Sequence, residues 1–481
     1  MNYSNWEEKY KKYAEKLVKD FKVPGTAIGI CNNGEMIFNE TFGYRDTERE
    51  LKINNDTIFG IGSITKSFTC MAIMQLQEAN KLNVHDPVVK YLPTFKMPKN
   101  KFTNEVTIHH LLTHTAGLPP LPSIFGALKS SMEIDPYVLK NDSIFSILES
   151  HPNLDTFDDL LNYIASYDID VLGPPGRYFS YSNDGMGLLG GIIAKCSRKT
   201  YEQYIVEHIL NPAGMNDTVF LLNEAKNQEN ITEIYVNKIK DKEEKILAAP
   251  CWWDAPSMRS AGFLKSSIND LLKYNEIFRT GGLVGNNRLL TEESVKSMYT
   301  PYIKCEIDKY YGYGLIVVPN SFGGTLIEHS GGIKGVSSQM FIIPERGITG
   351  AILTNIEGVS VKELMMGALN LISGQEVNTP LCQFSKLELA EDELNKFVGS
   401  FVSSDENTNI KVIIEDSSLK LNILGEEFDL VSVDEDKFIF RRRDSILGLV
   451  FFSGLEGDIN KVLFGGRILS KQTSNELQVN Q

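Results

Sequence analysis

Three short polar motifs lie far apart in this chain, and they can form one chemical site only if the fold brings them together. They are Ser63-Ile64-Thr65-Lys66, Tyr181-Ser182-Asn183 and His329-Ser330-Gly331. A serine, an amine one helical turn later, a phenol with an amide, and a late segment with glycine are parts from which an acyl-transfer site can be built. Any fold proposed for this sequence therefore has to place the three motifs in one pocket.

The patterns along the chain indicate how such a pocket forms. Apolar segments flank Asn32-Asn33-Gly34, which is a hairpin signal. An extended segment ends near Gly60 and helical spacing starts at Ser63, so this serine is expected at a strand-to-helix junction. Residues 117–173 are helix-like and strands return beyond Lys304. The order predicts one α+β or α/β domain, in which helices flank a sheet fed from both ends. The late strands are expected at Gly314–Val318, Thr325–His329, Ser338–Ile343 and Thr349–Thr354.

The composition changes near Gly374, and residues 374–389 are predicted to be a linker. From Asn395 onward almost every segment is short and extended, with turn signals between segments. About seven or eight such strands predict a small antiparallel, lipocalin-like barrel or a sandwich. The expected domains are residues 1–373, with a helical subdomain at about 80–250, and residues 390–481. The barrel strands are expected at Phe397–Val402, Ile410–Ile414, Leu419–Ile423, Phe428–Val431, Phe438–Arg441, Leu447–Phe452 and Lys461–Phe464.

Composition and charge exclude several classes of function. The chain has 481 residues, 42% of them hydrophobic, and a net charge of -14, which disfavours nucleic acid and anionic membranes as partners. The polar N-terminus lacks the apolar core of a signal peptide, and the apolar run Gly185–Ala194 is too short to span a bilayer. A cytosolic protein is therefore expected. The six cysteines are scattered, and His110 and His114 lack a third ligand, so neither a metal nor another cofactor is expected.

The first two motifs carry a nucleophile and the groups that activate it. A serine hydroxyl needs a base within hydrogen-bond reach, and Lys66 projects from the same helix face as Ser63. Burial and the helix N-terminus both favour the neutral amine that could accept a proton. Tyr181 is the expected partner, since nearby cations would favour its phenolate, and the Asn183 amide can hold Lys66 and the substrate.

The spacing of a serine and a lysine is weak evidence when it stands alone. The segment Ser417-Ser418-Leu419-Lys420 has the same spacing inside the predicted barrel, where no function is assigned to it. A serine and a lysine at this spacing, without further motifs, are more often a helix N-cap and an exposed lysine. The functional interpretation of Ser63 and Lys66 depends on the other two motifs following in order.

Over Val23 to about Leu371 the chain resembles the penicillin-binding protein and class C β-lactamase group of serine hydrolases. The resemblance implies a β-lactamase-like fold in which Ser63 is the nucleophile and Lys66 and Tyr181 act as base and proton shuttle. It also implies that Asn183 orients, and that the backbone N–H groups of Ser63 and Gly332 form the oxyanion hole. The segments that carry it are Val23–Gly25, Asp56–Lys66, Lys81–Asp86, His110–Leu118, Pro175-Gly176, Tyr181–Asn183 and Gly312–Gly314.

The third motif departs from many members of that group, which carry Lys-Thr-Gly where this chain has His329, Ser330 and Gly331. A histidine with an ordinary pKa of about 6.5 is mostly neutral at pH 7. This weakens the case for an efficient β-lactamase or for a carboxypeptidase that needs a free C-terminus. Members that resemble D-aminopeptidases use His-x-Gly here and also carry a β-barrel. The barrel either narrows the entrance to the site or stabilises the fold or a homo-oligomer.

The function expected from these residues is hydrolysis of an amide or ester through an acyl-enzyme on Ser63. His329 is expected to help Tyr181 activate the water, and Ser330, Gly331 and Gly332 are expected to contact the substrate. A small peptide, which can contain D-residues, is the favoured substrate. A carboxylic ester is the close alternative and weak β-lactam hydrolysis is the third. A non-catalytic penicilloyl-binding or assembly protein is the rival class, against which the intact polar motifs argue.

Overall fold

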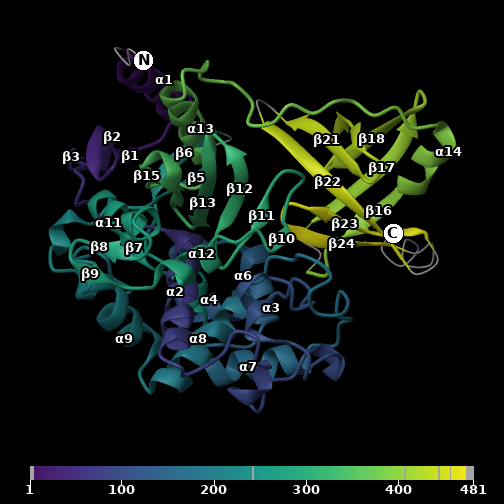
Figure 1. Cartoon of the computed structure of the whole chain (residues 1–481), viewed down its shortest axis with the longest axis horizontal. Helices are drawn as coiled ribbons and strands as arrows, with labels where there is room; N and C mark the ends of the chain where they lie inside the picture. Colours follow the sequence, from purple (N-terminus) through teal and green to yellow (C-terminus); the bar gives the residue numbers. More distant parts are fainter. Residues whose placement is uncertain (1–4, 241–242, 406–407, 443–444, 455–456, 473–481) are drawn as a thin grey trace.

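The N-terminal hairpin and the late strands join in one antiparallel sheet, as the order of elements predicts (Figure 1). The computed structural model describes residues 5–240, 243–405, 408–442, 445–454 and 457–472. The join is β1 (Gly25–Asn32) against β15 (Ile348–Thr354). The sheet order is β10-β11-β12-β13-β14-β15-β1-β2-β3. Its other strands are β2 (Glu35–Asp46), β3 (Leu51–Lys52), β10 (Ile303–Lys304), β11 (Tyr310–Tyr311), β12 (Ile316–Ser321), β13 (Gly324–Ile333) and β14 (Val336–Ile343).

Different helices cover the two faces of this sheet (Figure 1). On one face, α1 (Trp6–Asp20) and α13 (Val361–Ile372) share a core with alternate side chains of the central strands. On the other face lie α11 (Ile268–Arg279) and α2 (Thr65–Glu78). Both cores leave β14 buried along its whole length. The sheet is therefore an internal layer, and only its edges and strand ends are available to build a site.

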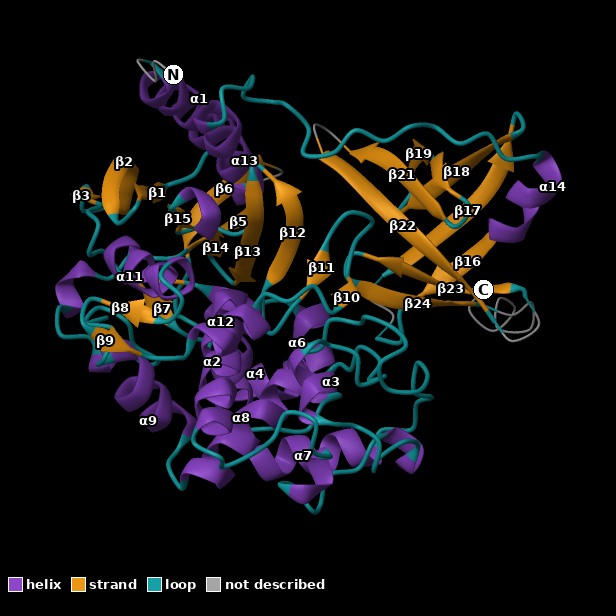
Figure 2. Ribbon diagram, in the orientation of Figure 1, coloured by secondary structure: helices purple, strands orange, loops and turns teal. Residues whose placement is uncertain are grey.

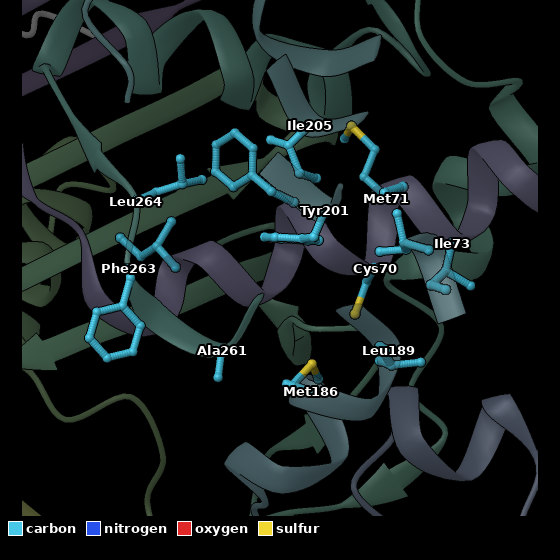
Figure 3. Close-up of a cluster of buried hydrophobic side chains, with 14 of the residues drawn as sticks. Cys70, Met71, Ile73, Met186, Leu189, Tyr201, Ile205, Ala261, Phe263 and Leu264 are labelled. Atoms are coloured by element: carbon cyan, nitrogen blue, oxygen red, sulfur yellow. The ribbon is translucent and has the colours of Figure 1, made fainter. Parts of the chain in front are cut away.

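A helical subdomain packs against α2, whose side chains are almost all buried. The buried cluster in Figure 3 brings α2 together with α8, α9 and the segment Ala261–Leu264. The helices expected between residues 117 and 173 are present as four short helices. The helices are α3 (Ile108–Leu112), α4 (Ser123–Met132), α5 (Pro136–Leu139), α6 (Asp142–Glu149), α7 (Phe157–Ser166), α8 (Asn183–Ser197), α9 (Tyr201–Ile205) and α10 (Arg259–Gly262).

The sequence of residues 223–245 is charged and weakly patterned, which predicts an exposed excursion, but these residues contain most of a β-hairpin of β5 (Tyr235–Lys240) and β6 (Glu243–Ala248). That expectation was wrong because Tyr235 and Val236 bury their side chains against the sheet. Tyr235 also bridges to Ile356 after β15. The many charged residues of this segment obscured the alternating apolar residues of the two strands. Two smaller pairs are β4 (Phe59–Gly60) with β7 (Lys265–Ser266), and β8 (Leu283–Val284) with β9 (Asn287–Arg288).

The C-terminal region is a nearly closed antiparallel barrel rather than a sandwich (Figure 2). Its strands form one sheet in the order β19-β18-β17-β16-β24-β23-β22-β21-β20, and an ion pair between Arg442 and Glu426 links β21 to β19. Nine strands exceed the number expected, because Phe428–Val431 is shared by two strands and the last strand was missed. The strands are β16 (Gly399–Val402), β17 (Asn409–Glu415), β18 (Ser418–Ile423), β19 (Glu426–Asp429), β20 (Val431–Asp434), β21 (Lys437–Arg442), β22 (Ser445–Ser453), β23 (Ile459–Phe464) and β24 (Arg467–Lys471).

Between α13 and the barrel the chain runs without a regular element until α14 (Glu391–Leu394). This interval includes the predicted linker. It is tied to α13 where the side-chain amide of Asn370 donates to the carbonyls of Val377, at 3.0 Å, and Thr379, at 2.9 Å. In the part of the chain that the structure describes, no helix has the length and apolar character required to cross a bilayer.

Candidate active site

Ser63 lies in a 3-10 turn, Gly62–Ile64, between β4 and α2, at the expected strand-to-helix junction. Gly62 has a φ of +49°, in the left-handed region that favours glycine. A Cβ added at Gly62 would lie 2.7 Å from the backbone nitrogen of Gly332. The glycine therefore allows the turn that carries Ser63 to lie directly against β13.

The fully buried amine of Lys66 is surrounded by three oxygen atoms. Its Nζ lies 3.1 Å from Ser63 Oγ, and it donates to Asn183 Oδ1 at 2.9 Å and to the Ala261 carbonyl at 2.5 Å. A neutral amine has two N–H groups and one lone pair. The two carbonyl acceptors can take both N–H groups, which leaves the lone pair for the proton of Ser63. Ala261 is a contributor that no sequence pattern identified.

Burial lowers the pKa of Lys66 to about 7, since removing an ammonium from water penalises its charged form. The positive charge of Arg467 lowers this pKa further, although Cys70 opposes both effects. Near neutral pH a large share of Lys66 is consequently unprotonated. This is the form that can accept a proton from the serine.

The second motif lies at the start of α8. Ser182 caps the helix, and its Oγ accepts the N–H of Gly185 at 3.0 Å. Asn183, the first helical residue, bonds to Lys66, and the Ser63 hydroxyl lies near enough to Tyr181 to lower the pKa of its phenol. Lys66 Nζ also lies 4.7 Å from the centre of the Tyr181 ring. The structure thus brings together the alcohol, amine, phenol and amide that the first two motifs supply.

His114 holds the second motif in place, a role that no sequence pattern indicated. Its Nδ1 accepts the N–H of Ser182 at 3.2 Å, and its carbonyl accepts the N–H of Ser180 at 2.9 Å. Its ring lies 4.5 Å from the ring of Tyr181, measured between centroids. His110, in contrast, bonds to Thr107 at the N-terminus of α3. Within the described ranges, no group of three metal-ligating side chains lies close enough to hold an ion.

The protonation of Tyr181 differs from the expected phenolate. Burial raises the pKa of this phenol well above its usual value, and the hydrogen bond with Ser63 and the charge of Arg467 offset only part of the increase. The expectation of a phenolate was wrong because burial outweighs the charge of Arg467, and Lys66, with a pKa of about 7, is only partly charged at neutral pH. Tyr181 therefore keeps its phenolic proton at neutral pH.

The third motif lies on β13, whose residues alternate between a buried and an open face. His329 and Gly331 are buried, whereas Ser330 and Gly332 are exposed. A Cβ at Gly331 would lie 2.0 Å from the carbonyl of Ile61, so this position requires glycine for the close approach of the Ser63 turn. A Cβ at Gly332 would meet nothing within 4 Å. The open face of β13 thus borders the serine through Ser330 and Gly332.

His329 is held by bonds to its own strand and to its neighbour. Its Nδ1 donates to the carbonyl of Ser330 at 2.6 Å, which leaves Nε2 to accept from the Tyr311 hydroxyl at 3.1 Å. Burial, with a contribution from Lys66, lowers the pKa of His329 to about 4. The imidazole is neutral at pH 7 as expected, but both of its nitrogens are engaged. These bonds tie the imidazole to β11 and to its own strand, β13.

A turn of the barrel lies against the second motif, at residues that no sequence pattern indicated. The carbonyl of Gly466 accepts the N–H of Tyr181 at 2.9 Å. The next residue, Arg467, pairs with Asp405 at 2.7 Å and lines a small cavity of about 80 Å³ together with Tyr181 and Asn183. The missed strand β24 begins at Arg467, so no sequence pattern connected this cation with the serine.

A buried ion pair fixes the turn after the third motif. Lys334, in the β13–β14 turn, pairs with Asp135 in the helical subdomain. Lys334 also donates to the carbonyl of Cys251 at 2.8 Å, and Trp253 Nε1 donates to Asp135 at 2.9 Å. Burial alone would raise the pKa of Asp135, but these donors, chiefly Lys334, hold it below its ordinary value. The pair fastens the helical subdomain to the strand that carries Gly332.

Comparison with known families finds one model that matches most of the chain. The model described as Beta-lactamase matches residues 11–370, which include all three motifs. Two curated relatives are penicillin-binding protein 4* of Bacillus subtilis, 24% identical over 440 residues, and protein flp of Staphylococcus aureus strain MW2, 25% identical over 382 residues. The first alignment covers 89% of this chain and 90% of the relative, and the second covers 79% and 67%.

Two solved structures share the arrangement of both the sheet and the barrel regions. The octameric penicillin-binding protein homologue from Pyrococcus abyssi is 28% identical, with a TM-score of 0.67 over 96% of this chain and 99% of the other. SurE is 21% identical, with a TM-score of 0.69 over 98% and 99%, which shows likeness of fold. These matches confirm the resemblance and the fold class expected from the motifs.

Proposed function

Because the chain belongs to the beta-lactamase family, we propose that it is a serine hydrolase that cleaves an amide or ester through an acyl-enzyme on Ser63. The observation that carries the proposal is the contact between Lys66 and Ser63. A buried amine with a pKa of about 7 lies 3.1 Å from the hydroxyl, with its N–H groups directed to other acceptors. This is the arrangement that turns a weak nucleophile into a reactive one.

In the acylation step, Ser63 Oγ forms a bond to the carbonyl carbon while its proton passes to Lys66 Nζ. The backbone N–H groups of Ser63 and Gly332 are proposed to stabilise the resulting oxyanion. When the tetrahedral intermediate collapses, the bond to the leaving group breaks. Tyr181 gives its hydroxyl proton to that group and is reprotonated by Lys66. The products of this step are the acyl-enzyme and a free amine or alcohol.

In the deacylation step, a water molecule takes the place of the leaving group. Its proton passes to Lys66 through Tyr181, its oxygen bonds to the acyl carbon, and the bond to Ser63 Oγ breaks as the serine is reprotonated. Asn183 keeps Lys66 in place through both steps by its hydrogen bond of 2.9 Å. His329 orients Tyr311 and β13 instead of helping to activate the water, because both of its ring nitrogens are already hydrogen-bonded.

We further propose that the substrate is a short peptide whose free carboxylate is recognised by Arg467. The histidine in the third motif removes the permanent positive charge that many relatives carry there. Arg467 supplies a cation at the entrance, close enough for its charge to affect Lys66, Tyr181 and Asp184. The contact between Gly466 and Tyr181 favours a barrel that shapes this entrance. A peptide that contains D-residues belongs to the same substrate class.

The proposal is tested with a fluorophosphonate probe and a panel of short peptides, their amides, p-nitrophenyl esters and nitrocefin. The native chain should be labelled and should turn over at least one substrate class, whereas Ser63→Ala should do neither. Ser417→Ala is the matched control, because that serine has the same spacing to a lysine, and Lys420 is paired with Asp429 at 2.6 Å. Absence of labelling in the native protein would exclude the acyl-enzyme. Labelling without turnover would identify a covalent sensor.

A further inference from the structure

His114, shortly after the end of α3, has a backbone conformation that residues with a side chain seldom adopt. Its φ is +56°, in the left-handed region. Among the residues other than glycine whose φ and burial the structure describes, it alone has a positive φ and a buried side chain, which is 3% exposed. Such conformations persist only where the surrounding structure holds them, and they are concentrated at functional sites.

The hydrogen bonds of His114 determine which ring nitrogen carries the proton. Nδ1 accepts the N–H of Ser182 at 3.2 Å, so in the neutral imidazole the proton lies on Nε2. Burial, with smaller contributions from the charges of Lys66 and His329, holds the pKa of His114 well below its ordinary value. The ring is therefore neutral at pH 7 and has a single N–H group, at Nε2.

This N–H group has no oxygen or nitrogen acceptor among the described residues. Protein atoms also pack so closely around Nε2 that it presents no surface to a water molecule. A buried donor without an acceptor costs the free energy of its lost hydration, and native proteins retain few such groups. His114 thus combines two unfavourable features, a left-handed backbone and an unpaired donor, that packing alone would not require.

Three aromatic rings lie around the imidazole of His114. The Tyr181 ring is the nearest of them, with 4.5 Å between centroids, followed by Tyr311 at 4.9 Å and Phe179 at 5.9 Å. An aromatic face carries partial negative charge and can attract an N–H group. Phe179 has no ionisable group, and the Tyr311 hydroxyl donates to His329 at 3.1 Å. Of these three rings, Tyr181 is the one whose charge changes in the proposed reaction.

We propose that the Nε2–H group of His114 stabilises the negative charge that develops on Tyr181 when this tyrosine gives its proton to the leaving group. The inference rests on the proposed acyl-enzyme mechanism. In that step the Tyr181 O–H bond breaks, its electron pair stays on the phenol, and the proton bonds to the departing nitrogen or oxygen. Lys66 then returns a proton to Tyr181.

The location of the N–H group beside the ring suits this role. A phenolate shares its charge between its oxygen and its ring carbons, so an N–H group beside the ring attracts the phenolate more strongly than the phenol. A donor that is in place before the charge develops also needs no reorganisation during the reaction. His114 transfers no proton and acts through Tyr181, as a positioning residue.

The effect of His114 should depend on the leaving group of the substrate. An alcohol or an amine departs readily only when it receives a proton, whereas p-nitrophenolate departs as a stable anion. His114 should therefore accelerate reactions with basic leaving groups and have little effect on p-nitrophenyl esters. A residue that only maintains the fold would affect all substrates alike.

His114→Asn removes the Nε2–H group and retains the other properties of this position. An asparagine carbonyl can accept the N–H of Ser182 in place of Nδ1, and asparagine is among the residues that tolerate a positive φ. His110→Asn is the matched control, since Nδ1 of His110 likewise accepts a backbone N–H, that of Thr107, at 3.1 Å.

The test is kcat/KM for p-nitrophenyl, phenyl and benzyl acetate, which share an acyl group and differ in the basicity of the leaving group. In His114→Asn the value should fall by about tenfold for benzyl acetate, the size of a lost hydrogen bond to a charged group, and less for phenyl acetate. It should be unchanged for p-nitrophenyl acetate. His110→Asn should match the native chain with all three esters.

Tyr181→Phe provides a second measurement, because it removes the group through which His114 acts. Adding His114→Asn to this variant should cause no further loss with any ester. The inference is overturned if His114→Asn lowers all three values equally or none of them, or if the double variant shows a further loss. Those results would leave the acyl-enzyme on Ser63 in place. A native chain that hydrolyses none of the esters would overturn both proposals.

Discussion

The backbone N–H of Tyr181 donates to the carbonyl of Gly466, at 2.9 Å. This single bond joins the proposed proton donor to a turn of the C-terminal barrel. The neighbouring residue Arg467 affects the pKa of both Tyr181 and Lys66 through its charge. The barrel thus contacts a residue that takes part in the proposed reaction. Substitutions in this turn of the barrel should alter both the pH profile of the rate and the choice of substrate.

The pH profile of kcat/KM should have an acid limb with a midpoint near pH 7. The free enzyme must have a neutral Lys66 to accept the serine proton, and burial sets the pKa of Lys66 at about 7. The rate should fall about tenfold per pH unit well below this midpoint. Steady-state hydrolysis of a p-nitrophenyl ester from pH 5 to 9 would measure it.

His329→Gln provides the control for this assignment. The pKa of His329 lies at about 4, so its loss should leave the midpoint near pH 7 in place even if kcat falls. A midpoint that moved by a full unit or disappeared in this variant would assign the limb to His329 and remove Lys66 from the role of base.

Lys66→Met should make the fold more stable, and more so at pH 6 than at pH 10. The native pKa of about 7 lies below the ordinary value of 10.5, so the native state binds fewer protons than the unfolded state between these values. The stability of the native chain therefore rises with pH in this window, and the cost of the buried amine is greatest below it. Urea unfolding at both pH values, with Lys296→Met as the exposed counterpart, checks the sign. A destabilised Lys66→Met at pH 6 would contradict it.

Arg467→Ala should lower kcat/KM for a peptide with a free carboxylate by about tenfold and affect the corresponding peptide amide much less. The same change should move the acid limb to higher pH, because Arg467 lowers the pKa of Lys66. Arg442→Ala is a suitable control, since this arginine pairs with Glu426 on the same barrel away from Tyr181. Equal losses for acid and amide would show that Arg467 acts on structure alone.

Asp135→Asn should destabilise the chain by about 3–5 kcal/mol, since it leaves the buried Lys334 ammonium without its partner. It should also lower kcat, because Lys334 follows Gly332 by two residues in the turn after β13. The double variant Asp135→Leu with Lys334→Met should recover most of the stability. Denaturant unfolding and kcat for all three variants test the pair; equal stability of Asp135→Asn and the native chain would show that it is dispensable.

Much of the architecture follows from local patterns that the structure retains. The Asn32-Asn33-Gly34 signal gives the turn between β1 and β2, in which Asn33 and Gly34 both have positive φ. The order of strands and helices predicted a sheet that takes strands from both ends of the domain, and the structure adds that β1 and β15 are the strands that pair. The proximity of Ser63, Lys66, Tyr181 and Asn183 followed from chemistry, since these side chains have little reason to occur in that order otherwise.

The features that escaped prediction depend on contacts between distant segments. His114 holds Tyr181 in place through the backbone of the flanking residue Ser182, and the Ala261 carbonyl accepts from Lys66. Neither residue type indicates such a role in the sequence. Arg467 begins a strand that was not recognised and reaches the site through the placement of the whole barrel. The raised pKa of Tyr181 likewise depends on burial, which no local pattern reveals.

The pairing of β1 with β15 also bears on how the chain comes to be active. Thr26 and Thr354 are partners in the middle of the sheet, so the central layer cannot be completed during synthesis until the ribosome has released nearly three quarters of the polypeptide. Contacts between residues so distant in sequence form slowly, because the chain loses the entropy of closing a long loop before the contacts contribute any stability. Newly made chains should therefore pass through a period in which Ser63 has been synthesised but the sheet beside it has not formed.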